Sequence, residues 1–270
     1  MEKKLLSGVL IFALVSAMFV GFGAGTGSKS TFKGSLTGVT LNIGTSGTYA
    51  PFSYYKTDGR TLQGYDVDFL KDLQSVLGFK ISNNTLQAMD YSPLTTSVSL
   101  GKLDIAAAAL CATSKRKKSM NFTNTYYDAG VVVIVSKNNT TIKSVSDLKS
   151  GKYKVAIQTG TVAFDYATAN LPQSCVQTFD SQALAYKAVE GGQADATIYD
   201  APGTAYSIKT GAIKLKIVGK EFFNGQSPYA IALSFNICKK YPNIVKDFNV
   251  AIAYLKSNGT LNKLKKKWCQ

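Results

Sequence analysis

The sequence contains two stretches in which the expected strands and helices follow one another in the same order. In the first stretch we expect strands and helices in alternation at residues 39–43, 67–77, 80–87, 94–100 and 105–110. In the second stretch the same order is expected at residues 154–158, 162–169, 175–179, 181–190 and 196–199. A β-α-β-α-β alternation predicts a largely parallel sheet with helices on both of its faces. Two such stretches therefore predict two lobes.

Two apolar segments are expected to connect these lobes. Residues 130–135 lead from the first stretch to the second, and residues 229–233 lead back. Apolar residues then recur at helical spacing in 244–255 and 261–268, and these tail helices should pack on the first lobe. The sequence thus predicts an α/β protein of two lobes, each a mainly parallel sheet flanked by helices, joined by a two-strand hinge.

The beginning of the chain has the layout of a secretory signal peptide. A short charged start is followed by an uncharged, mostly apolar run from Leu5 to Gly23 and then by small residues. A membrane anchor that stays uncleaved is the alternative. Because no cysteine precedes Cys111, the usual bacterial lipid-attachment cysteine is missing. We expect export to the periplasm or another extracytoplasmic space.

The expected division of the chain follows from these patterns. Residues 1–25 form the signal peptide, 26–38 a flexible spacer, 39–129 and 227–270 lobe 1, and 130–226 lobe 2.

The chain has no histidine, which excludes several classes of enzyme. Ser-His and Cys-His nucleophilic pairs and histidine-based zinc sites all require that side chain. The sequence also lacks a Walker-type loop, G-x-S-x-G and G-x-G-x-x-G. We therefore expect no catalytic residues, no cofactor and no metal. The net charge of +15 comes from mostly scattered lysines without a nucleic-acid motif, so we expect no nucleic-acid partner.

Four cysteines lie in the expected exported part: Cys111, Cys175, Cys238 and Cys269. An oxidising compartment permits disulfides, and the sequence alone does not separate the three connectivities that four cysteines allow. We favour a bridge between Cys238 and Cys269 as a staple for the C-terminal helices, which leaves the other two cysteines free.

Distinctive side chains follow three of the expected strands, at the edge where open parallel sheets bind ligands. Ser46 and Tyr49 follow the first strand, Cys111 and Arg116 follow residues 105–110, and Asp200 ends residues 196–199. Arg116 is one of two arginines against 29 lysines, and a guanidinium grips a carboxylate through two parallel hydrogen bonds. A solvated surface charge among neighbouring lysines is the alternative. Since a carboxylate at a buried strand end needs a donor or cationic partner, Arg116 and Asp200 should grip the two ends of a zwitterion.

Asp66 and Asp68 form a second carboxylate pair, at the expected start of helix 67–77. Catalysis is one interpretation of the pair. We favour capping by Asp66 and helix-dipole stabilisation by both.

Several short segments carry a family resemblance through their order and spacing. They are Gly47–Ser53, Gly64–Asp68, Thr113–Lys118 with Asn121–Thr123 and Tyr126–Tyr127, Asp147–Gly151 before Val155–Thr161, and Gly192–Asp200. Each segment is a weak signal alone. Together, over Leu41 to Trp268, they resemble the solute-binding proteins of polar amino-acid ABC transporters, bacterial extracellular family 3.

The resemblance implies a type II-like periplasmic-binding-protein fold. By position, Arg116 falls on the arginine that grips the ligand's carboxylate, and Asp200 falls on the acid that binds its ammonium. Tyr49 and Tyr91 fall where aromatic rings sandwich the ligand's stem. The alternative for both tyrosines is that they are ordinary lobe-surface aromatics.

The resemblance also implies roles for smaller residues. Gly160 and Thr161 fall where lobe 2 donates backbone and hydroxyl hydrogen bonds to the carboxylate, and Thr161 is also a candidate helix cap. Ala109 and Cys111 fall on positions that are often small or hydroxylated, and the alternative for Cys111 is a small buried hydrophobe. Ser46 falls where several binders of basic amino acids carry an acid, so its neutrality argues against lysine or arginine as ligand.

The function that the resemblance implies is capture of a free L-amino acid, polar and not basic, by hinge closure. A monomer would then deliver it to the membrane permease of an ABC transporter. One alternative is an exported enzyme on the same scaffold, similar to cyclohexadienyl dehydratase, which needs a further acid in the cleft besides Asp200. Another is an extracellular sensor domain, which would keep its N-terminal segment.

Overall fold

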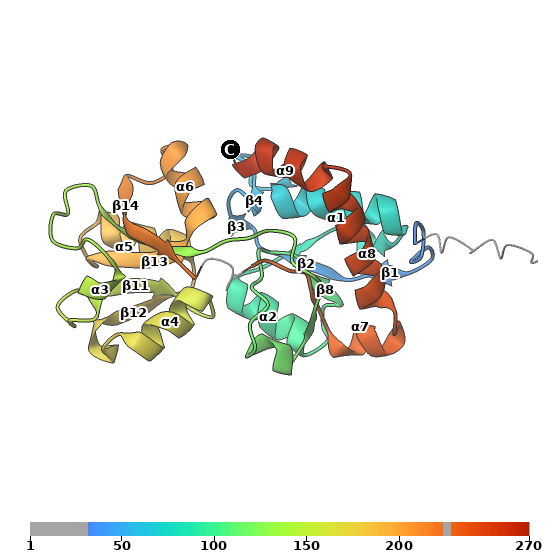
Figure 1. The fold of residues 1–270 in the computed structure, drawn as a ribbon, viewed down its shortest axis with the longest axis horizontal. Helices are drawn as coiled ribbons and strands as arrows, with labels where there is room; N and C mark the ends of the chain where they lie inside the picture. Colours follow the sequence, from blue (N-terminus) through green and yellow to red (C-terminus); the bar gives the residue numbers. More distant parts are fainter. Residues whose placement is uncertain (1–31, 224–227, 270) are drawn as a thin grey trace, which may run out of the picture. The chain divides into compact units, whose positions relative to one another are not determined.

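Residues 32–223 and 228–269 are described by a computed structural model of the chain (Figure 1). The expected signal peptide, residues 1–25, and the first part of the expected spacer lie outside the described residues. Among the helices that are described, none is both long enough and apolar enough to span a membrane. Two five-stranded sheets with their helices organise this part of the chain.

The first sheet has the strand order β7-β2-β8-β15-β9. Its strands are β2 (Ile43–Thr45), β7 (Gln87–Ala88), β8 (Ile105–Ala106), β9 (Asn121–Phe122) and β15 (Ala232–Leu233). Strand β2 is parallel to β7 and β8, whereas β15 is antiparallel to both β8 and β9. Only β15 therefore runs against the other strands of this sheet.

The second sheet repeats this plan, with the order β12-β11-β13-β10-β14. Its strands are β10 (Val131–Ser136), β11 (Val155–Gln158), β12 (Val176–Phe179), β13 (Ala196–Asp200) and β14 (Leu215–Phe222). Here β10 is the strand that runs against the others. In each sheet the opposed strand is the one that arrives from the other half of the chain. The expected mainly parallel sheets and the two connecting segments are confirmed.

The first sheet is buried on both faces. Along residues 105–110, the side chains of Ile105 and Ala107 join the core that includes helix α1 (Tyr65–Leu77). Those of Ala106 and Ala108 join a second core with helix α2 (Tyr91–Ser99). This period-two exchange between two apolar cores explains why the segment shows no apolar–polar alternation in the sequence.

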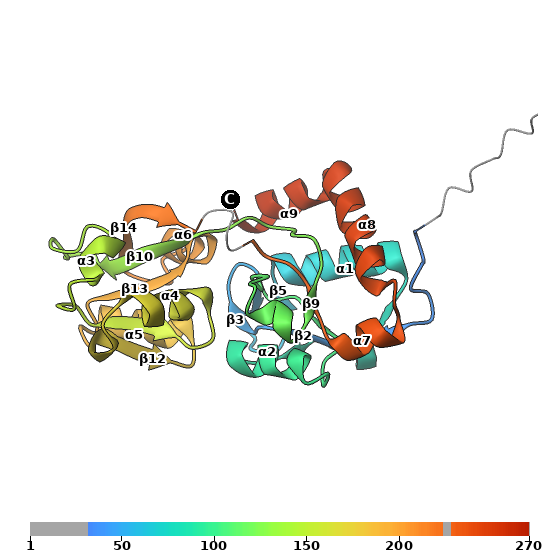
Figure 2. The same ribbon diagram turned by 60° about the horizontal axis from the view of Figure 1, so that its bottom comes forward.

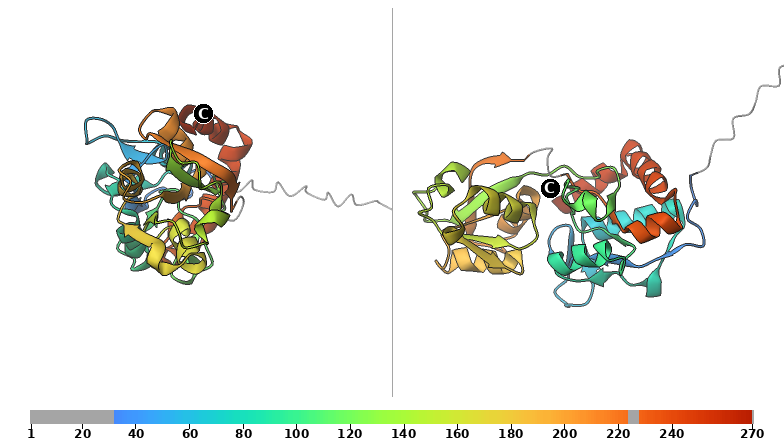
Figure 3. Two further views of the ribbon diagram at one scale, coloured as in Figure 1. Left: turned by 90° about the vertical axis from the view of Figure 1, so that its left-hand side faces the viewer. Right: turned by 90° about the horizontal axis from the view of Figure 1, so that it is seen from below.

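The C-terminal helices return to the first sheet, as the apolar spacing predicted. They are α7 (Phe235–Lys240), α8 (Ile244–Ser257) and α9 (Thr260–Cys269). Helices α8 and α9 pack against α1 and bury apolar residues in its core. The red α8 and α9 lie beside the cyan α1 in Figure 2 and in the right-hand view of Figure 3.

Four helices accompany the second sheet: α3 (Val145–Leu148), α4 (Val162–Asn170), α5 (Gln182–Glu190) and α6 (Ala201–Lys209). Helices α4 and α5 pack on β11 and β13 and belong to different cores. Three begin at a capping side chain that accepts a backbone N–H, namely Ser144, Thr161 and Ser181.

Two smaller sheets flank the first. Strands β1 (Thr40–Leu41) and β6 (Lys80–Ile81) are parallel, and β3 (Thr48–Tyr49), β4 (Ser53–Tyr55) and β5 (Leu62–Gln63) are antiparallel. The expected turn between β4 and β5 is present, because Asp58 Oδ1 accepts the N–H groups of Arg60 and Thr61, each at 2.8 Å.

Two expected strands are shorter than the sequence suggested. Residues 80–87 are broken into β6, the 3₁₀ turn η1 (Ser82–Asn84) and β7, because Asn83 and Asn84 have φ of 53° and 51°. Residues 105–110 form a regular strand only at β8, and Ala109 has φ of 50°. Left-handed residues end both ladders.

The expectation that Asp66 caps α1 is wrong. Gly64 occupies the N-cap position, and Asp66 lies inside the helix with no exposed surface. Its carboxylate is turned into the core and does not cap the helix. Asp68 faces outward and pairs with Lys71 at 3.1 Å and Lys267 at 2.7 Å.

The expected bridge between Cys238 and Cys269 is also wrong, since both are free thiols. Cys238 lies on α7 and Cys269 ends α9, and these helices flank opposite ends of α8 (Figure 1). A helix of this length separates its ends by about 20 Å, far beyond disulfide reach. Cys175 is a free thiol as expected.

Substitution of Gly64 by alanine is expected to destabilise the protein by about 3 kcal/mol or more. Gly64 has φ of 130°, and an added Cβ would clash with the backbone carbonyl of Phe52. Gly59→Ala is the matched control, because its φ is also positive (65°) but no described atom lies within 4 Å of the added Cβ. Urea unfolding should show a loss of only about 1 kcal/mol for Gly59→Ala. Equal losses for the two variants would contradict this packing argument.

Candidate functional site

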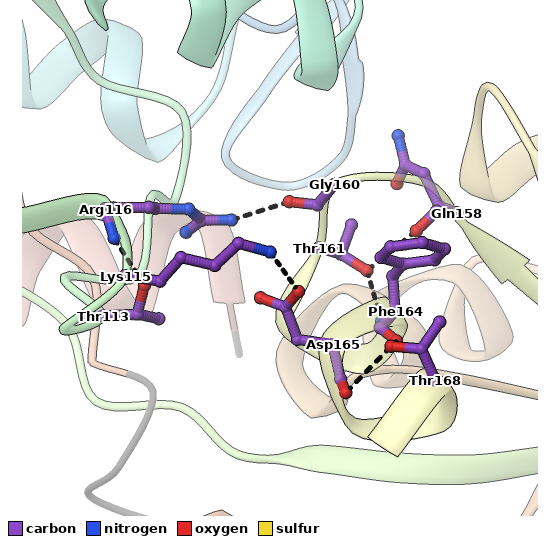
Figure 4. Close-up of polar contacts among 9 residues, drawn as sticks. All are labelled: Thr113, Lys115, Arg116, Gln158, Gly160, Thr161, Phe164, Asp165 and Thr168. Atoms are coloured by element: carbon purple, nitrogen blue, oxygen red, sulfur yellow. Dashed lines mark hydrogen bonds and ion pairs between the residues drawn. The ribbon is translucent and has the colours of Figure 1, made fainter. Parts of the chain in front are cut away.

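Arg116 begins the 3₁₀ turn η2 (Arg116–Lys118), just after the buried segment that continues β8. Its Nη1 donates to the carbonyl of Cys111 at 2.8 Å. Its Nη2 donates to the carbonyl of Gly160 at 2.9 Å, as Figure 4 shows. The guanidinium also lies 5.2 Å from the ring centroid of Tyr91, the first residue of α2. Arg116 is therefore not a solvated surface charge. A guanidinium has five N–H groups, so the two carbonyls leave donors for a further acceptor.

Asp200 ends β13 at the edge of the second sheet that the sequence predicted. Its Oδ2 accepts the hydroxyls of Tyr49 at 3.1 Å and Tyr229 at 2.9 Å. Burial raises the pKa of Asp200 to about 6, against the opposing effect of these two hydroxyls and of the Arg116 charge. A carboxylate can accept about four hydrogen bonds, so this group can also take an ammonium.

Tyr49, in the first half, packs against the second half. Its ring meets Tyr199 edge-on at 5.3 Å between centroids, and it fills the space where a side chain at position 203 would lie. Glycine at this position of α6 lets the ring approach. Tyr49 is only 6% exposed, so it is not an ordinary surface aromatic.

Ser46, Ala109 and Cys111 are all buried close to the ends of their strands. The hydroxyl of Ser46 accepts the backbone N–H of Thr48 at 3.2 Å. Cys111 pairs with Tyr229 through an antiparallel bridge, and burial raises the pKa of its thiol to about 12. The thiol is therefore neutral at physiological pH.

Gly160 and Thr161 form the turn between β11 and α4. Gly160 has φ of 74°, and its carbonyl is the group that Arg116 contacts. The Thr161 hydroxyl accepts the N–H of Phe164 at 3.1 Å and donates to the carbonyl of Gln158 at 2.9 Å (Figure 4). The structural prediction that Thr161 caps the helix is confirmed.

Further contacts connect the two halves beside this group. Lys115 Nζ lies 2.7 Å from Asp165 Oδ1 on α4, next to Arg116 (Figure 4). The hydroxyls of Tyr54 and Tyr206 are 3.1 Å apart. The ion pair is exposed and contributes little stability, whereas the contacts of Arg116 and Tyr49 are partly buried.

Two cavities adjoin these side chains. One of about 290 Å³ is bordered by Arg116, Gly160 and Asp165. The other, of about 260 Å³, is bordered by Tyr49, Tyr199 and Gly203. In residues 32–223 and 228–269 no cluster of acidic or cysteine side chains could hold a metal ion.

The sequence interpretation missed Tyr229, which donates to Asp200 and lies 3.0 Å from the Tyr49 hydroxyl. The pattern assigned it only to the returning strand. Tyr229 begins the segment that crosses back between the lobes. That position in the sequence could have indicated that it is a site residue.

Substitution Tyr229→Phe is expected to raise the pKa of Asp200 above about 6. The lost hydroxyl stabilises the ionised carboxylate, so its removal favours the protonated form. A pH titration of the Asp200 carboxyl carbon by NMR measures the shift. Tyr54→Phe is the control, because its hydroxyl partner is Tyr206, and it should leave that pKa unchanged. An unchanged or lower pKa in Tyr229→Phe would refute the assigned contact.

The family of bacterial extracellular solute-binding proteins, family 3, matches the chain over residues 41–270. The L-cystine-binding protein TcyJ of Escherichia coli (strain K12) is 30% identical over 267 residues, which cover 98% of this chain and 95% of the relative. A solved ancestral arginine-binding protein bound to glutamine has 32% identity and a TM-score of 0.74, covering 85% of this chain and 97% of its own. A solved ancestral amino-acid-binding protein, described as a precursor of cyclohexadienyl dehydratase, has 31% identity and a TM-score of 0.75, covering 86% and 96%. The chain belongs to the bacterial extracellular solute-binding proteins of family 3, and it has their two-lobed α/β fold.

Proposed function

We propose that the protein captures one free L-amino acid between its lobes and delivers it to the membrane permease of an ABC transporter. Relatives across nearly the whole chain are binding proteins for amino acids, which supports this function. The division into lobe 1 (residues 39–129 and 227–270) and lobe 2 (130–226) belongs to the same proposal. It rests on the two sheets and on the two strands, β10 and β15, that cross between the halves.

One observation carries the proposal: hydrogen bonds that join the two halves of the chain involve both Arg116 and Asp200. Arg116 donates to the carbonyl of Gly160, and Asp200 accepts the hydroxyls of Tyr49 and Tyr229. The positive charge of Arg116 also lowers the pKa of the Asp200 carboxyl. An α-amino acid is a zwitterion with the complementary charges one carbon apart. Arg116 binds its carboxylate through a bidentate pair, and Asp200 binds its ammonium.

The remaining site residues surround that zwitterion. Tyr49 and Tyr91 enclose its stem, and Gly160 and Thr161 add lobe-2 contacts near the carboxylate. Ser46, Ala109 and Cys111 border the side-chain end and set its chemistry. None of these three brings a negative charge, since the thiol of Cys111 is neutral.

Binding and closure are one equilibrium. The ligand contacts both lobes only when they are together, so its differential affinity shifts the population toward the closed arrangement. The hydrogen bonds from Arg116 to Gly160 and from Tyr49 to Asp200 are among the lobe-to-lobe contacts of that arrangement. The protein acts as a monomer in the exported space, after removal of residues 1–25.

A thermal-shift screen of the twenty amino acids with cystine and ornithine should identify the ligand. We expect a neutral polar amino acid to raise the melting temperature most, because a ligand that binds only the native state stabilises it. Lysine and arginine should give little shift, since Ser46 offers no charge to a basic side chain. The largest shift from arginine or lysine would contradict this selectivity.

Arg116→Ala is expected to lower the affinity for the ligand found in that screen by about 100-fold or more. The reason is that the desolvated charge pair between the guanidinium and the ligand's carboxylate is lost. Arg60→Ala is the matched control, since it removes the other arginine, which is exposed and lies on the loop after β4. Isothermal titration calorimetry should give wild-type affinity for that control. Retention of full affinity by Arg116→Ala would rule out the proposed carboxylate site.

An exported dehydratase is the second candidate. The raised pKa of Asp200, about 6, suits a general acid, although the solved neighbour described as a precursor of cyclohexadienyl dehydratase is itself an amino-acid-binding protein. Turnover of a cyclic amino-acid precursor by the purified protein would favour this enzyme over simple capture.

A further inference from the structure

Asp66 is a buried carboxyl group that the proposed ligand contacts do not use. It is the second residue of α1 and has no exposed surface. A carboxylate without water is costly unless its oxygens are bonded. Here each oxygen accepts one strong donor: Oδ2 accepts the backbone N–H of Ala109 at 2.7 Å, and Oδ1 accepts the hydroxyl of Tyr126 at 2.7 Å. Burial raises the pKa of Asp66 to about 7, while both donors favour the ionised form.

The first donor belongs to a strained residue. Ala109 has φ of 50°, a left-handed conformation that costs a residue with a Cβ about 1–2 kcal/mol. The bond from its N–H to a buried carboxylate is a charge-assisted one, which can offset that cost. Asp66 therefore stabilises the turn that ends the ladder of β8.

That turn leads directly to Arg116. Two residues after Ala109, the carbonyl of Cys111 accepts Arg116 Nη1 at 2.8 Å. The orientation of this carbonyl depends on the backbone angles of the turn. A change at Ala109 is thus transmitted through one short segment to the guanidinium.

The second donor, Tyr126, belongs to a backbone segment that is hydrogen-bonded to Tyr229. The backbone N–H of Tyr126 donates to the carbonyl of Tyr229 at 2.9 Å, and Tyr229 N–H donates to the carbonyl of Tyr127 at 2.8 Å. Tyr229 in turn donates its hydroxyl to Asp200. One carboxylate therefore holds the two backbone segments that present Arg116 and Tyr229.

We propose that Asp66 is a positioning residue of the ligand site, which fixes the backbone at Ala109 and Tyr126 and thereby orients Arg116 and Tyr229. The effect on ligand affinity rests on the proposed function, whereas the effect on Arg116 does not.

Asp66→Asn tests the proposal, with the amino acid selected by the wild-type screen as the probe. The amide keeps the size of the carboxylate but loses the charge and one acceptor, so affinity by calorimetry should fall about ten-fold or more. Asp68→Asn is the matched control from the same helix, because it loses ion pairs with Lys71 and Lys267 outside the site. Its affinity should stay within about two-fold of wild type. Wild-type affinity in Asp66→Asn, or an equal loss in Asp68→Asn, overturns the proposal.

A rescue variant separates positioning from general stability. Glycine adopts a positive φ without strain, so Ala109→Gly in the Asp66→Asn background should recover several-fold of the lost affinity. Failure to recover affinity in a folded double variant would refute the route through Ala109. If Asp66→Asn does not fold, Tyr126→Phe removes one donor only and should itself lower affinity several-fold. Full affinity in that variant then overturns the proposal.

NMR of the protein without ligand makes the test independent of the proposed function. The Ala109 amide proton and the Arg116 guanidinium signals should shift in Asp66→Asn and stay in place in Asp68→Asn. If the wild type binds no amino acid but these signals shift, the proposed function fails and the positioning role stands. If the Arg116 signals do not move, the positioning role fails.

Discussion

The guanidinium of Arg116 holds one backbone carbonyl from each half of the protein, at Cys111 and at Gly160. Both acceptors are uncharged, so neither of them neutralises the positive charge of the arginine. This is the arrangement that a carboxylate-binding site requires. The turn after β8 and the turn before α4 must both keep their backbone angles, because they hold the two carbonyls that Arg116 contacts.

The two buried carboxylates, like the guanidinium, are hydrogen-bonded by uncharged groups. Asp66 and Asp200 are held by hydroxyl and N–H donors, although the chain contains 29 lysines. In the described part of the chain the lysine ion pairs go to Asp68 and Asp165 near the surface. A lysine beside Asp200 would compete with a ligand's ammonium. Neutral donors keep the carboxylate desolvated and still attractive to a cation.

The order of strands and helices could be predicted from the sequence because it depends on local apolar spacing, and the positions of Arg116 and Asp200 followed from the strand-end rule. The bond from Ala109 to Asp66 could not, because it joins residues 43 positions apart and depends on a backbone angle that alanine rarely adopts. The predicted disulfide between Cys238 and Cys269 is wrong for a related reason. Helical spacing in the sequence does not show which helix ends lie close together. Both features depend on contacts between residues that are far apart in the sequence.

We propose that one site binds both charged ends of a zwitterion. Calorimetric titration of the wild-type protein with three matched compounds tests it most directly: the selected amino acid, its N-acetyl derivative and its carboxamide. N-acetylation removes the ammonium proposed to bind Asp200, and amidation removes the carboxylate proposed to bind Arg116. If Asp200 and Arg116 bind these two groups, each derivative should bind about 100-fold or more weakly than the free amino acid. Binding of either derivative with the affinity of the free amino acid would contradict it.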